Sequence, residues 1–382
     1  MKKSEGSGSE CCSTPSPNEQ QPCSCSSEKT KEQQPSVLCS TDTVIGNIPK
    51  ISFKWSWADR WGQIKCRIGS RRDDYKVTPG LYAIGTPDEN SDVFVTANYK
   101  LTFDILRKHL KGMNAWILAL DSKGINVWCA AGKGTFSTEE LIKQIKKTNI
   151  KNLVKHNKLI VPQLGAVGIS AHKVTEKTGF KVIYGPIKSA NIKSFVENNY
   201  NATEKMRKIE FPLIDRLLLV PVEFFQPWKK FLYLSAFTLL IFGLQPNGII
   251  FSYIFKEGLP IVILGAISIE AGAVLVPALL PILPTRSFAI KGFTIGLITP
   301  ILALIFSGYI PVLSNVYIII FCWILYPMIS SYIGLQFTGA STFTNMSGVK
   351  KELKMGLPIY ILCVVLSIIL IILFKLSAWR IL

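Results

Sequence analysis

The chain has 382 residues, a length that suits two domains or one domain followed by a membrane region. It carries 43 Lys and Arg against 25 Asp and Glu, a formal net charge of +18. Hydrophobic residues make up 48% of the chain and charged residues only 18%, which excludes a wholly disordered protein. From Lys229 to the end there are ten basic and three acidic residues. Because basic residues that flank apolar runs usually reflect membrane topology, we expect no binding of nucleic acid.

Residues 1–45 are expected to form a disordered tail, because Ser, Gly, Pro, Glu and Gln dominate and supply nothing to pack. The start of the chain, MKKSEGSGSE, lacks the apolar region of a secretory signal, so we expect reduced thiols. The Cys-Cys and Cys-Ser-Cys pairs could instead bind a soft metal. Five of the nine cysteines lie in this tail: Cys11, Cys12, Cys23, Cys25 and Cys39.

Residues 46–225 alternate short β-rich runs with segments of helical period, which predicts an α/β domain. Ser137 and Glu140 form a capping-box pattern at the start of one helix. Such repeated units indicate an open, mostly parallel sheet with helices on both faces, where ligands bind at the carboxyl ends of strands. The strands are expected at 93–96, 115–120, 125–130, 159–161, 181–184 and 217–220. Other helices are expected at 100–111, 171–178 and 190–198.

Residues 226–382 are expected to form an all-α transmembrane domain of five helices, because each apolar run approaches the ~20 residues that cross a bilayer. The runs are 231–251, 258–283, 292–310, 316–336 and 357–376. Their flanks carry more Lys and Arg on the side of the first domain than on the other, which predicts a cytoplasmic N-terminal domain. Glu270 lies within the second run, and an intramembrane carboxylate suggests a role in ion or substrate handling.

A single cysteine, Cys129, is expected at the end of a predicted strand, followed by small residues and a helix start. The glycines around Lys133 fit neither a phosphate-binding P-loop nor a dinucleotide fingerprint, because the required positions hold other residues. A catalytic thiol would need a nearby base, and all three histidines are far away in the sequence. An inert, buried thiol is equally compatible with the spacing, although the small residues leave space for a flat or bulky group above the sulfur.

The run from Asn126 to Lys133, NVWCAAGK, resembles the signature of the HgcA family, the corrinoid proteins of mercury methylation. The segments VTANY at 95–99, PQLGA at 162–166 and YGP at 184–186, and the five apolar runs, also resemble this family. The likeness extends from about residue 50 to the end of the chain. Asp92 stands where the family pattern has proline.

The resemblance implies a Rossmann-like domain that holds a corrinoid of the cobalamin type, with Cys129 as the lower axial ligand of cobalt. Asn126 would orient the cap that precedes Cys129 through its side-chain amide. Trp128 is expected to pack rather than to act as a cobalt ligand. No histidine fits the Asp-x-His-x-x-Gly loop of other corrinoid proteins. The implied cofactor contacts are Thr96, Asn126, Val127, Trp128, Cys129, Ala130, Ala131, Gly132, Lys133, Gln163, Leu164 and Gly165.

The activity that the resemblance implies is that of a cobalamin-dependent methyltransferase, which passes a methyl group to Hg(II) and produces methylmercury. The implied reductant is a small (HgcB-like) ferredoxin with two [4Fe-4S] clusters, since the chain has no Cys-x-x-Cys series. The implied methyl donor is a methylated folate that acts through a methyltransferase. The implied location is the cytoplasmic (inner) membrane, as a multi-pass protein.

Two other interpretations remain open. The first is a five-span transporter or sensor whose cytoplasmic α/β domain binds a small ligand. Glu270 and the second and third apolar runs, which Gly and Pro interrupt, would suit transport. The second is a redox protein that uses the thiols of the tail. Cys129 distinguishes them, because only the corrinoid interpretation requires this thiol.

Overall fold

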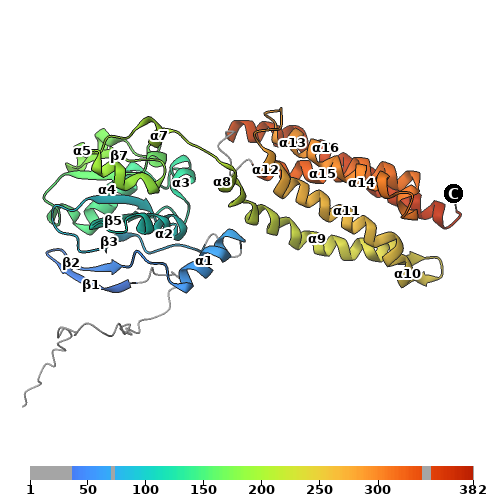
Figure 1. Ribbon diagram of the computed structural model, residues 1–382, viewed down its shortest axis with the longest axis horizontal. Helices are drawn as coiled ribbons and strands as arrows, with labels where there is room; N and C mark the ends of the chain where they lie inside the picture. Colours follow the sequence, from blue (N-terminus) through green and yellow to red (C-terminus); the bar gives the residue numbers. More distant parts are fainter. Residues whose placement is uncertain (1–36, 70–73, 338–345, 382) are drawn as a thin grey trace, which may run out of the picture. The chain divides into compact units, whose positions relative to one another are not determined.

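The computed structural model describes residues 37–69, 74–337 and 346–381 (Figure 1). The chain divides into two compact units. The α/β unit contains residues up to Ser56 and the segment Asp74–Ala202, and the helical unit contains Trp57–Asp73 and Thr203–Leu382. The expected boundary at 225/226 therefore differs from the observed one at 202/203. Strand β1, Val37–Thr43, already lies within the range expected for the tail, and the rest of that range up to residue 36 lies outside the described residues.

The α/β unit is built on a seven-stranded mixed sheet with the order β1-β2-β3-β5-β4-β6-β7. The strands β4, β5, β6 and β7 run parallel to one another, whereas β3 is antiparallel to β5 and β1 is antiparallel to β2. The strands are β1, β2 (Gly46–Ile51), β3 (Gly80–Ile84), β4 (Val93–Ala97), β5 (Ala115–Leu120), β6 (Lys158–Val161) and β7 (Lys181–Tyr184). A mostly parallel sheet is thus confirmed.

The central strands form the core of this unit. Every residue of β4 and β5 is buried, which explains why their sequences VFVTA and AWILAL are apolar, apart from Thr96, instead of alternating. Helices surround the sheet in Figure 1. They are α2 (Lys100–His109), α3 (Val127–Lys133), α4 (Thr138–Thr148), α5 (Ala171–Thr178) and α6 (Ile192–Glu197). The structure confirms the helices expected at 100–111, 171–178 and 190–198. It also confirms the cap at Ser137, because Ser137 Oγ accepts a hydrogen bond from Glu140 N.

A buried ion cluster fixes residues 52–54 to helix α2. Asp104 accepts hydrogen bonds from Lys100 Nζ and from Arg107 Nε, each at 2.8 Å. Arg107 Nη1 also donates to the carbonyl oxygens of Ser52 and Lys54 at 2.5 and 3.0 Å. All three charged side chains are almost fully buried, and their mutual pairing offsets the cost of removing them from water.

The helical unit contains α1 (Trp57–Arg67) and a long series of helices that follows the α/β unit. The series is α7 (Glu204–Arg207), α8 (Leu213–Leu217), α9 (Val220–Gly243), α10 (Phe251–Tyr253), α11 (Leu259–Glu270), α12 (Val276–Leu279), α13 (Phe288–Gly296), α14 (Ile298–Phe306), α15 (Val316–Gln336) and α16 (Met346–Ala378). A short hairpin of β8 (Leu244–Gln245) and β9 (Gly248–Ile249) follows α9. The strand predicted at 217–220 is wrong. Four apolar residues in a row fit a helix as well as a strand, and Pro221 suits the first turn of α9.

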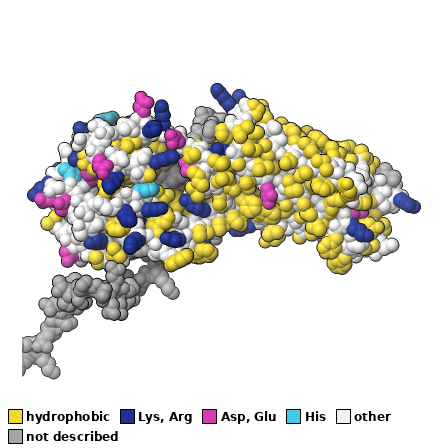
Figure 2. Space-filling model, viewed as in Figure 1, with side chains coloured by type: hydrophobic (Ala, Val, Ile, Leu, Met, Phe, Trp, Pro, Cys, Tyr) yellow, Lys and Arg dark blue, Asp and Glu magenta, His cyan; other side chains and the backbone are white. Residues whose placement is uncertain are grey.

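Four stretches of the described helices are long and apolar enough to cross a membrane, by length and composition. They are Phe251–Leu279, Phe288–Phe306, Val316–Gln336 and Gly348–Ala378. The run expected at 231–251 is divided between α9 and the hairpin, so a fifth span is not confirmed. Figure 2 shows that the visible surface of the helical unit is mostly hydrophobic, whereas charged side chains are scattered over the α/β unit.

Small residues bring the helices of this unit close together. A Cβ atom on Gly292 of α13 would come within 2.6 Å of the carbonyl oxygen of Ser330 on α15. Ser330 Oγ donates to the carbonyl oxygen of Gly292 at 2.8 Å, and Ser268 Oγ donates to that of Tyr326 at 2.6 Å. Close approach at Gly and Ser with interhelical hydrogen bonds is typical of helices that pack in a bilayer.

Candidate functional site

Cys129 lies in the first turn of a short helix, α3, and not in a strand. Asn126 precedes the helix in an extended conformation, and its Oδ1 accepts a hydrogen bond from Cys129 N at 2.9 Å. Gly134 ends the helix with a left-handed backbone, φ 77°. An Asn cap and a terminal glycine are common helix boundaries. The strand predicted at 125–130 is therefore wrong, because that prediction followed the apolar residues and ignored the cap.

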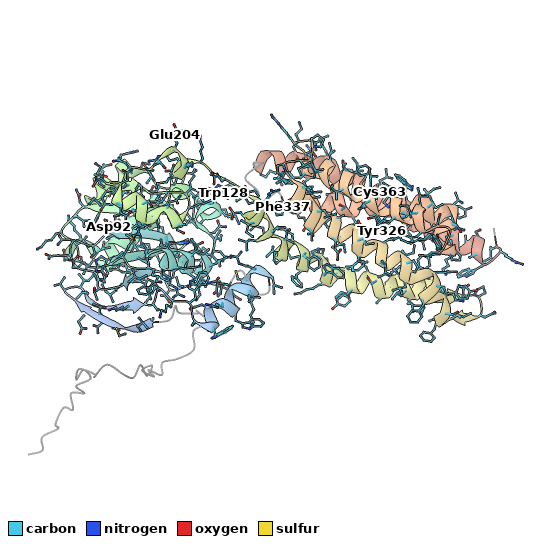
Figure 3. All side chains as sticks on the ribbon, viewed as in Figure 1. Asp92, Trp128, Glu204, Tyr326, Phe337 and Cys363 are labelled. Carbon is cyan, nitrogen blue, oxygen red and sulfur yellow. The ribbon has the colours of Figure 1, made fainter. Side chains whose placement is uncertain are left out.

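Helix α3 has a buried side and an outward side. The buried residues are Val127, Ala130 and Ala131. The outward side is formed by Trp128, Cys129, Gly132 and Lys133, of which Cys129 is half-buried and the others are exposed. Trp128, labelled in Figure 3, is 39% exposed, so part of its indole lies on the surface. The half-buried thiol thus lies on the outward side of α3.

The loop between β5 and α3 is held by Asn98, a buried residue directly after β4. Asn98 Oδ1 accepts hydrogen bonds from Ser122 N at 3.0 Å, from Ser122 Oγ at 2.9 Å and from Gly124 N at 3.0 Å. Gly124 has φ 73°, a backbone conformation that glycine adopts at low cost. Asn98 therefore joins the carboxyl ends of two neighbouring strands and positions the entry to α3. The sequence analysis did not single it out, although a polar residue directly after a buried strand is a usable signal.

A second support of this loop comes from α4. Glu140 Oε1 accepts hydrogen bonds from Asp121 N at 3.1 Å and from Gln144 Nε2 at 2.7 Å. Asp121 pairs with Lys123 at 2.6 Å. Partial burial acts to raise the pKa of the Asp121 carboxyl, but the hydrogen bonds and charge of Lys123 outweigh it, so the pKa is lowered. The Asp121 carboxylate thus stays ionised and paired with Lys123 within the loop.

The segment after β6 packs directly against α3. A Cβ atom on Gly165 would come within 2.5 Å of the Phe136 ring and within 3.2 Å of Val127, so only glycine fits the observed packing. Gln163 and Leu164 lie beside Gly165 in a single 3-10 turn and are half-buried. The structure therefore brings two groups of candidate residues together, 126–133 and 163–165.

These loops lie where the strand order reverses. The chain passes from β4 to β5 on one side, and then returns to β6 on the other side of β4. In open sheets of this kind the loops diverge at such a point and leave a crevice for ligands. Thr96 lies near the end of β4 but is only 2% exposed, so it lies beneath the surface of this edge.

The histidines lie elsewhere and have their own partners. His109 Nδ1 lies 2.8 Å from Ser189 Oγ, His156 Nε2 lies 3.0 Å from the carbonyl oxygen of Ser91, and His172 contacts Ser170. Burial, assisted by Lys108, lowers the pKa of His109. Within the described ranges, no group of three or more His, Cys, Asp and Glu side chains could hold a metal ion. A protein-derived ligand set for a metal is therefore not found there.

Other candidate residues lie apart from this edge. Cys39 is exposed on β1, and Cys11, Cys12, Cys23 and Cys25 lie outside the described residues. Glu270 is exposed at the end of α11 in the helical unit. Asp92, the departure from the family pattern, accepts a hydrogen bond from Tyr200 OH at 2.8 Å, so it has a structural partner of its own.

Residues 70–196 match the family described as CO dehydrogenase/acetyl-CoA synthase delta subunit. The chain is 32% identical over 145 residues to the acetyl-CoA decarbonylase/synthase complex subunit gamma of Methanopyrus kandleri, which covers 37% of this chain and 31% of that protein. It is 33% identical over 135 residues to the subunit of the same name from Archaeoglobus fulgidus, covering 35% and 28%.

The chain is also 32% identical over 126 residues to the corrinoid/iron-sulfur protein large subunit of Moorella thermoacetica, covering 32% of this chain and 28% of that protein. The chain thus matches less than a third of the length of these relatives. The matched family segment contains β4 to β7 and all of the loops that surround Cys129. By sequence, the α/β unit is therefore similar to part of the corrinoid-protein family.

Proposed function

We propose that the chain is a membrane-anchored corrinoid protein of the HgcA kind, which transfers a methyl group to Hg(II). The observation that carries this proposal is the half-buried thiol of Cys129, on the outward side of α3 at the carboxyl edge of the sheet. The similarity of residues 70–196 to corrinoid-protein subunits supports the cofactor class. The NVWCAAGK run is the basis for the more specific assignment.

The residues of this edge fit a corrinoid. A Cβ atom on Gly132 would meet nothing within 4 Å, so the outward side of α3 is open above the thiol. Cys129 would provide the sulfur ligand, and the cap by Asn126 would fix the backbone that carries it. The segment 163–165 would line the edge beside the ring. When bound, a corrinoid with an anionic sulfur ligand supplies a methyl group that can leave to an electrophile such as Hg(II).

The protein's contribution is positioning. Asn98 and Glu140 hold the loop that precedes α3, so the thiol keeps one place relative to the sheet. The rigid strand ends and the packed Gly165 leave little freedom for the two loops to separate. A thiolate, and not the thiol, is the form that binds metals. Electrons would come from a small ferredoxin with [4Fe-4S] clusters, and the methyl group from a methylated folate through a methyltransferase.

The proposed location is the cytoplasmic membrane, with the α/β unit in the cytoplasm. The four apolar stretches and the small-residue packing of the helical unit support insertion in a bilayer. The basic residues at the flanks support the orientation. This orientation requires the run at 231–251 to cross the bilayer as well. The basic residues on the proposed inner side are then Lys229, Lys230, Arg286, Lys291, Lys350, Lys351 and Lys354, against Lys256, Lys375 and Arg380 outside.

The test is an anaerobic absorption spectrum of the full chain in detergent, reconstituted with cobalamin, beside the variants Cys129→Ala and Cys39→Ala. We expect a sulfur-to-cobalt signature in the wild type and in Cys39→Ala, whose thiol lies exposed on β1, and its loss in Cys129→Ala. Methyl-loaded protein should then convert Hg(II) to methylmercury only where the signature is present. If Cys129→Ala keeps the signature, the ligand assignment is refuted. If no variant binds cobalamin, a transporter or sensor becomes the better interpretation.

A further inference from the structure

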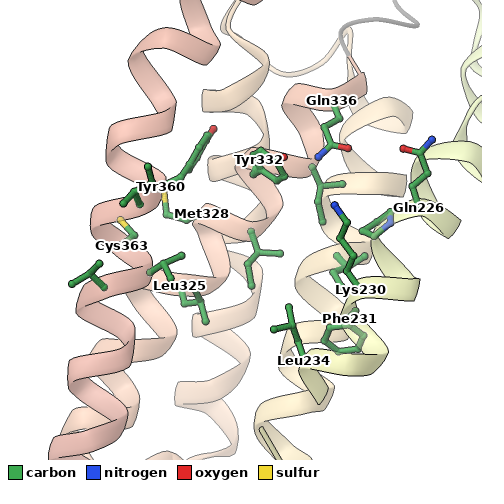
Figure 4. A pocket seen from close by; sticks show the side chains of 17 residues that line it. Gln226, Lys230, Phe231, Leu234, Leu325, Met328, Tyr332, Gln336, Tyr360 and Cys363 are labelled. Carbon is green, nitrogen blue, oxygen red and sulfur yellow. The ribbon is translucent and has the colours of Figure 1, made fainter. Parts of the chain in front are cut away.

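The helical unit contains a groove of about 680 Å³ that the proposed methyl transfer does not use. Helices α9, α15 and α16 form most of its walls, and α11 contributes Ile269. The volume lies within the range of sites that hold small organic ligands, about 300–1,000 Å³. Figure 4 shows this groove with its lining side chains.

The two ends of the groove differ in chemistry. Gln226, Lys230 and Gln336 lie toward one end in Figure 4, whereas Phe231, Leu234 and Leu325 lie toward the other. The polar end carries one ammonium group and two amides, all of which can donate hydrogen bonds. None of the described residues that line the groove is acidic. A ligand with an anionic, oxygen-rich head and an apolar tail would therefore complement the groove.

Two tyrosines also line the groove and lie nearer its polar end in Figure 4. The rings of Tyr332 and Tyr360 meet edge to face, with centroids 5.6 Å apart and an interplanar angle of 78°. Tyr360 OH lies 2.9 Å from Ser331 Oγ, which fixes its ring. Because this hydroxyl already has a partner, Tyr360 presents mainly its ring surface to the groove. This wall suits a hydrocarbon chain more than a second polar group.

Helix α1 gives an independent indication of where the polar end lies in a bilayer. Trp57, Trp61 and Ile64 are 84%, 58% and 45% exposed and recur at helical spacing on one side of α1. Arg60 and Lys65 lie over the two indole rings, at 5.6 and 5.4 Å from the ring centres. Exposed tryptophans with basic neighbours are typical of helices that lie in the headgroup region.

The end of α1 meets the polar end of the groove. A Cβ atom on Gly69 would lie 4.0 Å from Gln226 Nε2 and 3.9 Å from Val222. Arg67 Nη1 donates to the carbonyl oxygen of Leu218 at 3.3 Å, which fixes α1 to the segment before α9. The polar end of the groove and the tryptophan side of α1 thus belong to one packed region of the helical unit.

We propose that this groove binds one phospholipid, with its phosphate at Lys230, Gln226 and Gln336 and an acyl chain along α9, α15 and α16. This inference rests on the proposed membrane location and not on the corrinoid. It assigns to the groove a ligand that holds α9 against α16. Lys229 offers a matched comparison, because it is an exposed neighbour of Lys230 that does not line the groove.

The test is native mass spectrometry of the full chain, released from bilayer discs, with titration of phosphatidylglycerol, phosphatidylcholine and diacylglycerol of the same chain length. We expect one tightly held phospholipid and no tight binding of diacylglycerol, which lacks the phosphate. Lys230→Gln should weaken the binding of phosphatidylglycerol about fivefold, the effect of one basic residue near an anionic headgroup, and Lys229→Gln should leave it unchanged. Equal effects of the two variants, or equal binding of diacylglycerol, would overturn the proposal.

Two further measurements keep the inference testable. Val364→Trp should fill the groove and abolish tight binding, whereas Ile368→Trp, on an exposed position of α16 outside the groove, should not. In the unmutated chain, bound phosphatidylglycerol should slow alkylation of Cys363, which lines the groove. Unchanged alkylation, or protection of Cys363 only in a dimer or in complex with another protein, would contradict a lipid occupant. If the chain does not enter bilayer discs at all, the proposed location fails and the lipid assignment fails with it.

Discussion

Replacement of Asn98 by alanine is the sharpest test of how the fold positions Cys129. The substitution removes the acceptor of three hydrogen bonds at a site that is 2% exposed. Ser122 keeps other partners, since its N also bonds the carbonyl oxygen of Leu120 and its Oγ that of Ile125. Gly124 N loses this acceptor. A buried donor without a partner costs about 1–3 kcal/mol, and the small cavity adds to this, so we expect about 2–4 kcal/mol in total.

Hydrogen exchange of the full chain measures this effect locally. Amides in residues 121–129 should exchange about 30- to 900-fold faster in Asn98→Ala. This factor is the loss of about 2–4 kcal/mol converted into the increased population of the open loop. The control is Asn114→Ala, in which an exposed Asn loses a single hydrogen bond from Thr86 N at 3.0 Å. It should change exchange only near residue 86. If Asn98→Ala leaves the loop as protected as in the wild type, Asn98 does not position α3 and the reasoning is refuted.

Three further predictions concern the same unit. Asn126→Ala should destabilise α3 by about 1 kcal/mol through loss of its cap, and Asn126→Asp should restore most of it, as measured by exchange of that helix. Gly165→Ala should lower the free energy of unfolding in urea by about 1–3 kcal/mol, because the added methyl group meets Phe136. The control Gly132→Ala should leave the stability unchanged or raise it. It should weaken cobalamin binding only if a corrinoid lies on that side of α3. The pKa of His109 is lowered in the folded state, so the stability that this residue contributes above its ordinary pKa is lost as the pH falls through the folded-state pKa. His109→Gln should therefore lose less free energy of unfolding than the wild type between about pH 7 and about pH 5. Equal losses in the two proteins would contradict this.

Much of the α/β unit follows from local pattern. The strands at 93–97 and 115–120 are continuous apolar runs, and the helix at 171–178 ends at Gly179 as its sequence indicates. The strand predicted at 125–130 failed because a single side chain, Asn126, decides between strand and helix there. The grouping of 126–133 with 163–165 was predictable from the rule that loops meet at the carboxyl edge of parallel strands.

Other features required the three-dimensional structure. The role of Asn98 depends on which strands are neighbours, because its partners lie 24 and 26 residues away. The groove depends on α9, which is remote in the sequence from α15 and α16, and no periodicity of one helix predicts it. Helix α1 was not predicted at all. Its partner at Leu218 is 151 residues further along the chain, and Trp57, Trp61 and Ile64 are exposed instead of packed in a core.

The position of α1 in the chain also has a consequence for biosynthesis. Residues 57–73 are made between strands β2 and β3, yet they belong to the unit that begins at residue 203. As the chain leaves the ribosome, the sheet can close before α1 has any permanent partner. During that interval the side of α1 that is buried in the folded chain, which includes Gln63 and Cys66, would also be exposed to chaperones, to aggregation or to the nearby bilayer. In a truncated chain that stops near residue 202, α1 would never meet the helical unit. We expect such a chain to be poorly soluble because of this unpacked helix, and not because the sheet is unstable.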